Sequence, residues 1–150
     1  AAAPRRIAAL FGASAIASGA AALTIAEQSR SACETGRPLD RIALVAGALE
    51  LFLLLSLRQR FREQGVDGAL NETGWGLAYD FGVMALGAGV PMLHHIENVI
   101  EPERAPRRAM TISLAVLAGG FLLRHVLLRA GNSSAKRPKD YFRLTGRVLE

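Results

Sequence analysis

The sequence predicts an all-α membrane protein in which four transmembrane helices form an up-down bundle. First, the 150-residue chain is 51% hydrophobic and has a mean hydropathy of +0.24, which is too apolar for an ordinary soluble domain. Second, the apolar residues fall into four stretches, three of which reach the roughly 17–20 residues that a helix needs to cross a bilayer. Third, these stretches lack the polar face of a soluble helix, so a soluble bundle with buried helices is disfavoured.

We expect the bundle to occupy residues 1–131, followed by a basic cytoplasmic tail over residues 132–150. The predicted spans cover about 7–26, 40–58, 76–96 and 109–129. The first is too long for a signal-peptide core, and three further spans follow it. The second apolar stretch is short, and snorkelling of Arg41 and Arg58 would extend it. Because no methionine opens the chain, we expect a fragment or a processed form of a longer protein.

Small residues form stripes along two of the predicted helices. Steps of three and four separate the members of each stripe, which are Ala8, Gly12, Ala15, Gly19, Ala22 and Ala26 in the first helix and Ala78, Gly82, Ala85 and Gly89 in the third. Small residues allow membrane helices to approach closely, which is how such helices associate without a hydrophobic driving force. We therefore expect both stripes to be helix-packing faces.

The second span contains one ionisable residue, Glu50, inside the most apolar run of the chain, residues 42–57. A carboxylate at bilayer depth costs about 2.5–3.5 kcal/mol on insertion scales, so its presence needs a reason. Helical spacing places Glu50 on one face with Ala43, Ala46 and Gly47, which predicts that it points into the bundle. No basic residue is expected at its depth. We therefore expect the carboxyl to be protonated or paired with a group outside this chain.

Two further charged residues lie inside predicted spans. Asp80 is about one turn into the third span, and Arg124 is about one turn from the end of the fourth. Because these helices should run antiparallel, both residues are expected at similar depth near the cytoplasmic side, which predicts an Asp80–Arg124 ion pair. Such a pair is more often structural than catalytic, and Arg124 could instead snorkel to the headgroups. Pro91 should kink the third span and free a carbonyl group.

Histidines and aromatic residues near the span ends predict positions at the membrane interface. His94 and His95 lie at the outer end of the third span and His125 at the inner end of the fourth, too far apart to share a haem. Trp75 and Tyr79 fit an aromatic belt at the headgroups. The chain carries no pattern of a nucleophilic triad, a phosphate loop or clustered metal ligands. We therefore expect no catalytic residues and no metal site.

The formal net charge of +5 arises from basic residues that flank the spans. They are not interleaved with aromatic residues, so nucleic acid is not an expected partner. Eleven of them fall on the side shared by the two termini and the loop 58–75, and six on the other side, so the positive-inside rule places both termini in the cytoplasm. The single cysteine, Cys33, excludes an intramolecular disulfide.

Three short segments carry a resemblance to a known family. Residues 81–91 read FGVMALGAGVP, residues 117–131 read LAGGFLLRHVLLRAG, and an upstream helix contains the step Leu49-Glu50-Leu51. These segments resemble the closing helices of the NrfD/polysulfide reductase membrane-subunit family, over about residues 42–135. Members of that family have about twice as many helices, so the resemblance implies a carboxy-terminal half.

The resemblance also implies a function. It implies a membrane anchor subunit of a quinone- or quinol-linked oxidoreductase, in the bacterial inner membrane, beside an iron–sulphur subunit and a molybdopterin catalytic subunit. Electron transport would involve quinone or menaquinone in the complex, and this chain would bind no cofactor itself. Proton translocation through a polar network of Glu50, Asp80 and Arg124 is a further implication. No quinone-binding residue can be carried over.

Two other functions stay open from the sequence. A small membrane carrier or channel would also place a carboxylate at the midplane and use a broken helix such as the one around Pro91. A purely structural anchor would use all its polar residues for helix packing. Solute flux by the isolated chain would favour the carrier or channel. Wild-type enzyme activity in Glu50, Asp80 and Arg124 variants that still assemble would favour the structural anchor.

Overall fold

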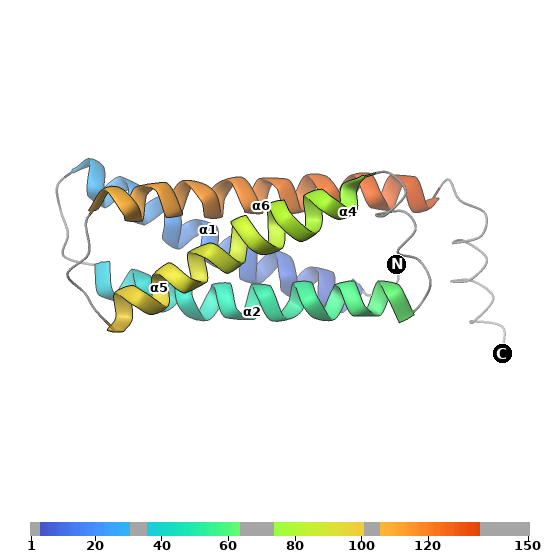
Figure 1. Cartoon of the computed structure of the whole chain (residues 1–150), viewed down its shortest axis with the longest axis horizontal. Coiled ribbons are helices and arrows are strands. Elements are labelled where there is room, and N and C mark those ends of the chain that lie inside the picture. The colour runs from blue at the N-terminus through green and yellow to red at the C-terminus, as the bar shows by residue number, and fades with distance from the viewer. Residues whose placement is uncertain (1–3, 31–35, 64–73, 101–105, 136–150) are drawn as a thin grey trace.

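The computed structural model describes residues 4–30, 36–63, 74–100 and 106–135, and these residues form four long helices. Helix α1 covers Pro4–Ser29, α2 covers Gly36–Glu63 and α6 covers Pro106–Ala135. The third helix is continuous through three segments, which are α4 (Trp75–Leu77), η1 (Ala78–Gly89) and α5 (Val90–Ile100). Consecutive helices run in opposite directions, and the third crosses the bundle obliquely (Figure 1). The predicted all-α fold is confirmed for these residues.

Three of the helices are long and apolar enough to cross a membrane. They are Arg5–Ser29, Trp75–Ile100 and Arg108–Asn132, of 25, 26 and 25 residues. Helix α2 is not among them, although it has 28 residues and packs along α1 in the same bundle. The chain is therefore a membrane protein with several spans, whereas a crossing by α2 stays a prediction. The predicted tail lies outside the described residues beyond Ala135, and Cys33 lies outside them as well.

The packing face of α1 differs from the predicted stripe. Ala13, Ala17, Ala20 and Ala21 are buried against the neighbouring helices, and Ala17 and Ala21 cluster with Ala46 of α2 and Val116 of α6. All six residues of the predicted α1 stripe are exposed, so that prediction is wrong. Alanine and glycine occupy nearly every face of α1, and small-residue spacing alone therefore could not identify the buried one.

The third helix and α6 touch backbone to backbone at one point. A Cβ atom built on Gly87 would lie 2.7 Å from the Cα atom of Gly119, and a Cβ atom on Gly119 would overlap the Cα atom of Gly87. A Cβ atom on Gly82 would likewise overlap the side chain of Leu122, whereas Ala85 of the predicted stripe is exposed. Glycine is thus required at this crossing because no side chain fits between the two helices.

Segment η1 of the third helix is wound as a π-helix. At its end the Val90 N–H donates to the carbonyl oxygen of Ala85, five residues earlier, and α-helical winding resumes ahead of Pro91. Proline lacks the N–H that an α-helix would use, and π-helical segments are frequent at functional sites. The irregularity expected near Pro91 therefore takes the form of a change in helix winding at the centre of the third helix.

Tyr79 anchors the start of the third helix to α2. Its side chain is fully buried, and its hydroxyl donates a hydrogen bond of 2.9 Å to the carbonyl oxygen of Leu54. The prediction that Tyr79 belongs to an interfacial belt is wrong, because the phenol satisfies a carbonyl inside the bundle. Trp75 is half-buried, and its ring centroid lies 5.3 Å from that of His125.

The Gly87–Gly119 crossing makes a prediction about stability. The substitution Gly119→Ala should lower the free energy of unfolding by about 1–3 kcal/mol, because the added methyl group forces two backbones apart. The matched control is Gly12→Ala, since a Cβ atom on Gly12 meets no atom within 4 Å. Thermal unfolding of the purified protein in detergent measures both. Equal stability of the two variants would contradict the close crossing.

Candidate functional site

Glu50 lies in the middle of α2 and is only 5% exposed. The prediction that it points into the bundle is confirmed, because Ala43 and Ala46 on the same face are also buried. Burying a charged carboxylate is expensive unless polar partners surround it. The groups that surround Glu50 therefore define the candidate site.

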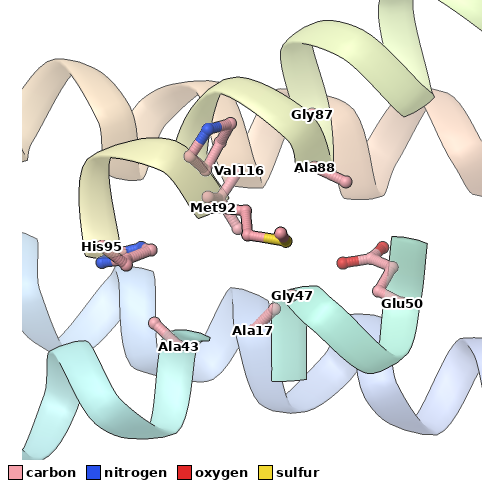
Figure 2. A pocket seen from close by; sticks show the side chains of 10 residues that line it. Ala17, Ala43, Gly47, Glu50, Gly87, Ala88, Met92, His95 and Val116 are labelled. Atoms are coloured by element: carbon pink, nitrogen blue, oxygen red, sulfur yellow. The ribbon is translucent and has the colours of Figure 1, made fainter. Parts of the chain in front are cut away.

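A small cavity opens beside Glu50 between the helices. The space open to a water molecule is about 10 Å³, which is room for about one water. Figure 2 shows the Glu50 carboxyl at one end of the cavity, His95 at the other and the Met92 side chain between them. The rest of the lining consists of small or apolar residues from all four helices, namely Ala17, Ala43, Gly47, Gly87, Ala88, Pro91 and Val116.

His95 is joined to Asp40 of α2 at the far end of this cavity. Its Nδ1 atom lies 2.9 Å from Asp40 Oδ1, and both side chains are mostly buried. His94 is 6% exposed, and its Nε2 atom lies 3.0 Å from the Asn98 amide nitrogen. Both histidines are therefore packed among the helices and are not exposed rings at a helix end, because the third helix continues to Ile100, whereas their depth in a membrane stays a prediction.

On its other side Glu50 faces α1 and α6. The Ser14 hydroxyl and the Arg124 charge both interact with the carboxyl. Arg124 Nη1 donates a 2.8 Å hydrogen bond to the carbonyl oxygen of Gly120, which holds the guanidinium near this part of the bundle. The expectation that Glu50 has no basic residue at its depth is therefore wrong. The distance of Arg124 from the helix end gives only the depth of its backbone, and its long side chain extends back along α6 to the Gly120 carbonyl.

Asp80 is paired with Arg58 rather than with Arg124. Arg58 Nη2 lies 3.1 Å from Asp80 Oδ2, and the Arg58 side chain is 9% exposed. The predicted Asp80–Arg124 pair is wrong, because α2 also runs antiparallel to the third helix and brings Arg58 to the level of Asp80. Arg58 lies about 12 Å along α2 from Glu50. Of the three predicted site residues, the structure thus brings together Glu50 and Arg124 and leaves Asp80 in a separate pair.

Sequence reasoning missed three members of this polar set: Ser14, Asp40 and His95. The spacing of Asp40, Ala43, Gly47 and Glu50 on one face of α2 was a signal for Asp40. Ser14 gave no signal, because serine is common in membrane helices. Within the described residues no group of three or more His, Cys, Asp and Glu side chains could hold a metal ion.

Long apolar helices, small-residue packing and buried charged side chains define a polytopic membrane protein with an internal polar site. A model of one family, described as polysulphide reductase NrfD, matches residues 5–134 and so covers all four helices. The chain belongs to the NrfD family, whose members are membrane subunits that work with other redox subunits. Comparison with curated proteins and with solved structures gave no significant match.

The revised pairing of Asp80 can be measured by a double-mutant cycle. Asp80→Asn and Arg58→Gln should be coupled by about 1 kcal/mol in unfolding free energy, a modest value because Asp80 is 40% exposed. The control cycle pairs Asp80→Asn with Arg124→Gln, whose effects should add to within about 0.5 kcal/mol. Denaturation in detergent micelles gives both values. Stronger coupling of Asp80 to Arg124 would contradict the pairing.

Proposed function

We propose that this chain is a membrane subunit of a quinone-linked oxidoreductase of the polysulfide reductase type, and that its bundle carries protons through Glu50. Membership of the NrfD family supports the first part. The second part rests on one observation, the water-sized cavity that the buried Glu50 and His95 both line. A water molecule in a protein interior needs two or more polar partners, and this cavity offers one at each end.

Each end of the cavity also has a counter-charge, which is the requirement for moving a proton in an apolar interior. When the Glu50 carboxyl gives its proton across the cavity, it becomes a carboxylate facing Arg124. When His95 receives that proton, it becomes an imidazolium beside Asp40. An ionised Asp40 accepts a hydrogen bond from Nδ1–H, so Nε2 is the nitrogen that takes up the proton. Neither proton position leaves an isolated buried charge.

The Arg58–Asp80 pair has a different part in this proposal. It lies toward the end of the bundle that the positive-inside rule places at the cytoplasm, whereas Asp40 and His95 lie toward the opposite end. With Glu50 between them, the polar groups of the bundle are spread along its length. We propose that Arg58 and Asp80 hold α2 and the third helix together and that Glu50 and His95 exchange the proton.

The cavity does not fit a quinone. Room for about one water is far too small for a quinone ring, so no quinone chemistry is placed beside Glu50. In the proposed complex the quinone or menaquinone, the iron–sulphur subunit and the molybdopterin subunit carry the electron transport. The residues of this chain bind, hold and move the proton. The proposed location is the bacterial inner membrane, with both termini in the cytoplasm.

A carrier or channel is the competing function, and one observation favours it. The change from π-helical to α-helical winding occurs between Gly89 and Val90, next to the cavity-lining residues Gly87 and Pro91. Transporters also place binding sites at interrupted helices. Ion or solute flux by the chain alone in proteoliposomes would support that function. Co-purification with redox subunits and absence of flux would support the oxidoreductase.

Replacing the central carboxyl tests the proposed proton path. Glu50→Gln keeps the side-chain shape and, in the complete complex, should lower proton translocation at least about ten-fold without loss of assembly. The matched control is Glu63→Gln, because Glu63 lies on the same helix and is exposed. Proton uptake by vesicles during quinol-dependent turnover gives the readout. Full translocation in Glu50→Gln would reduce Glu50 to a packing residue.

Filling the cavity separates the proton path from the stability of the fold. Gly47 lines the cavity, and a Cβ atom there meets no atom within 4 Å, so Gly47→Ala should fit and take up space needed by the water. A helical alanine is more stable than glycine by about 0.5–1 kcal/mol. We therefore expect slower proton translocation in a complex that is at least as stable as the wild type.

Gly12→Ala serves as the control in these measurements, because it makes the same change on an exposed face away from the cavity. An unaltered translocation rate in Gly47→Ala would show that no proton passes through the cavity.

A further inference from the structure

The cavity beside Glu50 is longer than the water that it can hold. Its lining residues Ala43, Gly47 and Glu50 occupy successive turns of α2, and Ala43 and Glu50 lie about 10 Å apart along the helix axis. Hydrogen-bonded waters advance about 2.8 Å per hydrogen bond, so about two or three waters in a row are needed to cover this length. The open space of about 10 Å³ admits about one. Part of the length of the cavity is therefore filled.

The side chain of Met92 fills this part. Figure 2 shows it between the Glu50 carboxyl and His95, with its sulfur-bearing end on the side of Glu50. A thioether donates no hydrogen bond and is at most a weak acceptor, so it cannot pass a proton on. A proton therefore cannot cross from Glu50 to His95 while the Met92 side chain lies in this position.

Met92 is also the wall residue that is able to move. Apart from Glu50 and His95, the other described lining residues are glycine, alanine, proline and valine, which are small or stiff. Methionine is unbranched, has several rotatable bonds and adapts to irregular space. Met92 is only half-buried, so its side chain has room to turn away from the cavity without the movement of a helix. Rotation of this one side chain would thus change the free length of the cavity.

We propose that Met92 is the gate of the proton path between Glu50 and His95. In the position described here it interrupts the row of waters, as apolar constrictions do in channels. With the side chain turned away, the Glu50 proton enters the row and the last water gives a proton to Nε2 of His95, which leaves a carboxylate and an imidazolium. When the side chain returns, the proton cannot run back. This inference rests on the proposed proton path and adds the element that opens and closes it.

Shortening the side chain tests the gate in the absence of turnover. Met92→Ala should admit a continuous row of waters and raise the passive proton permeability of vesicles that contain the complete complex about ten-fold. An entrapped pH-sensitive dye measures this permeability after a pH jump. Met110→Ala is the matched control, because it makes the same change at an exposed position of α6.

A second substitution distinguishes the gate from a loosened bundle. Adding Glu50→Gln to Met92→Ala should return the permeability to the wild-type value, because a proton that follows the proposed path must pass through the Glu50 carboxyl. A leak around loosened helices would persist in the double variant. Wild-type permeability in Met92→Ala, or a leak that survives Glu50→Gln, would overturn the proposal.

Met92→Ile keeps the test decisive if Met92→Ala does not assemble. Isoleucine has a volume close to that of methionine, but its branched Cβ atom leaves it one preferred rotamer in a helix. The gate should then stay closed, and proton translocation during quinol-dependent turnover should fall about ten-fold in an assembled complex. Met110→Ile is the control. A wild-type rate in Met92→Ile, in a complex whose translocation depends on Glu50, would overturn the proposal.

Water contact separates the gate from the proton path. Solid-state NMR measures magnetisation transfer from water to the His95 ring, and Met92→Ala should increase this transfer whether or not protons travel along the cavity. If the transfer increases while Glu50→Gln leaves translocation intact, then Met92 excludes water and the proposed path fails. If Glu50→Gln stops translocation while Met92→Ala changes neither water contact nor permeability, then the path stands and the gate fails.

Discussion

The burial of the Glu50 carboxyl is the constraint on which the rest of this structure depends. A carboxyl that is 5% exposed inside an apolar bundle must be neutral or compensated, because an isolated charge there is strongly disfavoured. The bundle meets this constraint from two directions. Ser14 and Arg124 approach from α1 and α6, and a water-sized cavity leads to His95 and Asp40 on the other side. A carboxyl that served packing alone would need only the first of these arrangements.

Close helix packing makes the site possible. Gly87 and Gly119 bring the third helix and α6 into backbone contact, and buried alanines such as Ala17, Ala21 and Ala46 pack α1 against α2. The oblique third helix then places Gly87 and Pro91 along the cavity beside Glu50 and His95 at its far end (Figure 2). Side chains of ordinary size at these positions would fill the cavity. The same small residues that hold the helices together therefore leave the space for water.

Sequence reasoning predicted the all-α fold and the inward-facing Glu50, but it did not predict which helix faces pack together or which side chains pair between helices. The face of Glu50 followed from helical periodicity, because small residues mark only one side of α2. The packed face of α1 could not be predicted in this way, because alanine and glycine occupy nearly every face of that helix. The position of Asp80 along its helix predicted that it lies near one end of the bundle. That position does not say whether α2 or α6 supplies the neighbouring basic residue, and the structure pairs Asp80 with Arg58 of α2. The surroundings of His95 could not be predicted, because no capping residue in the sequence marks that the third helix continues to Ile100.

The most direct measurement of the central claim is the rate of proton translocation in the complete complex carrying Glu50→Gln and His95→Gln, separately and together. If the two residues exchange one proton through the cavity, each substitution lowers the rate, and the double variant is no slower than the slower single variant, because residues that act as a unit are not additive. Multiplied effects, or a single variant with the wild-type rate, would contradict the proposal that Glu50 and His95 form one path.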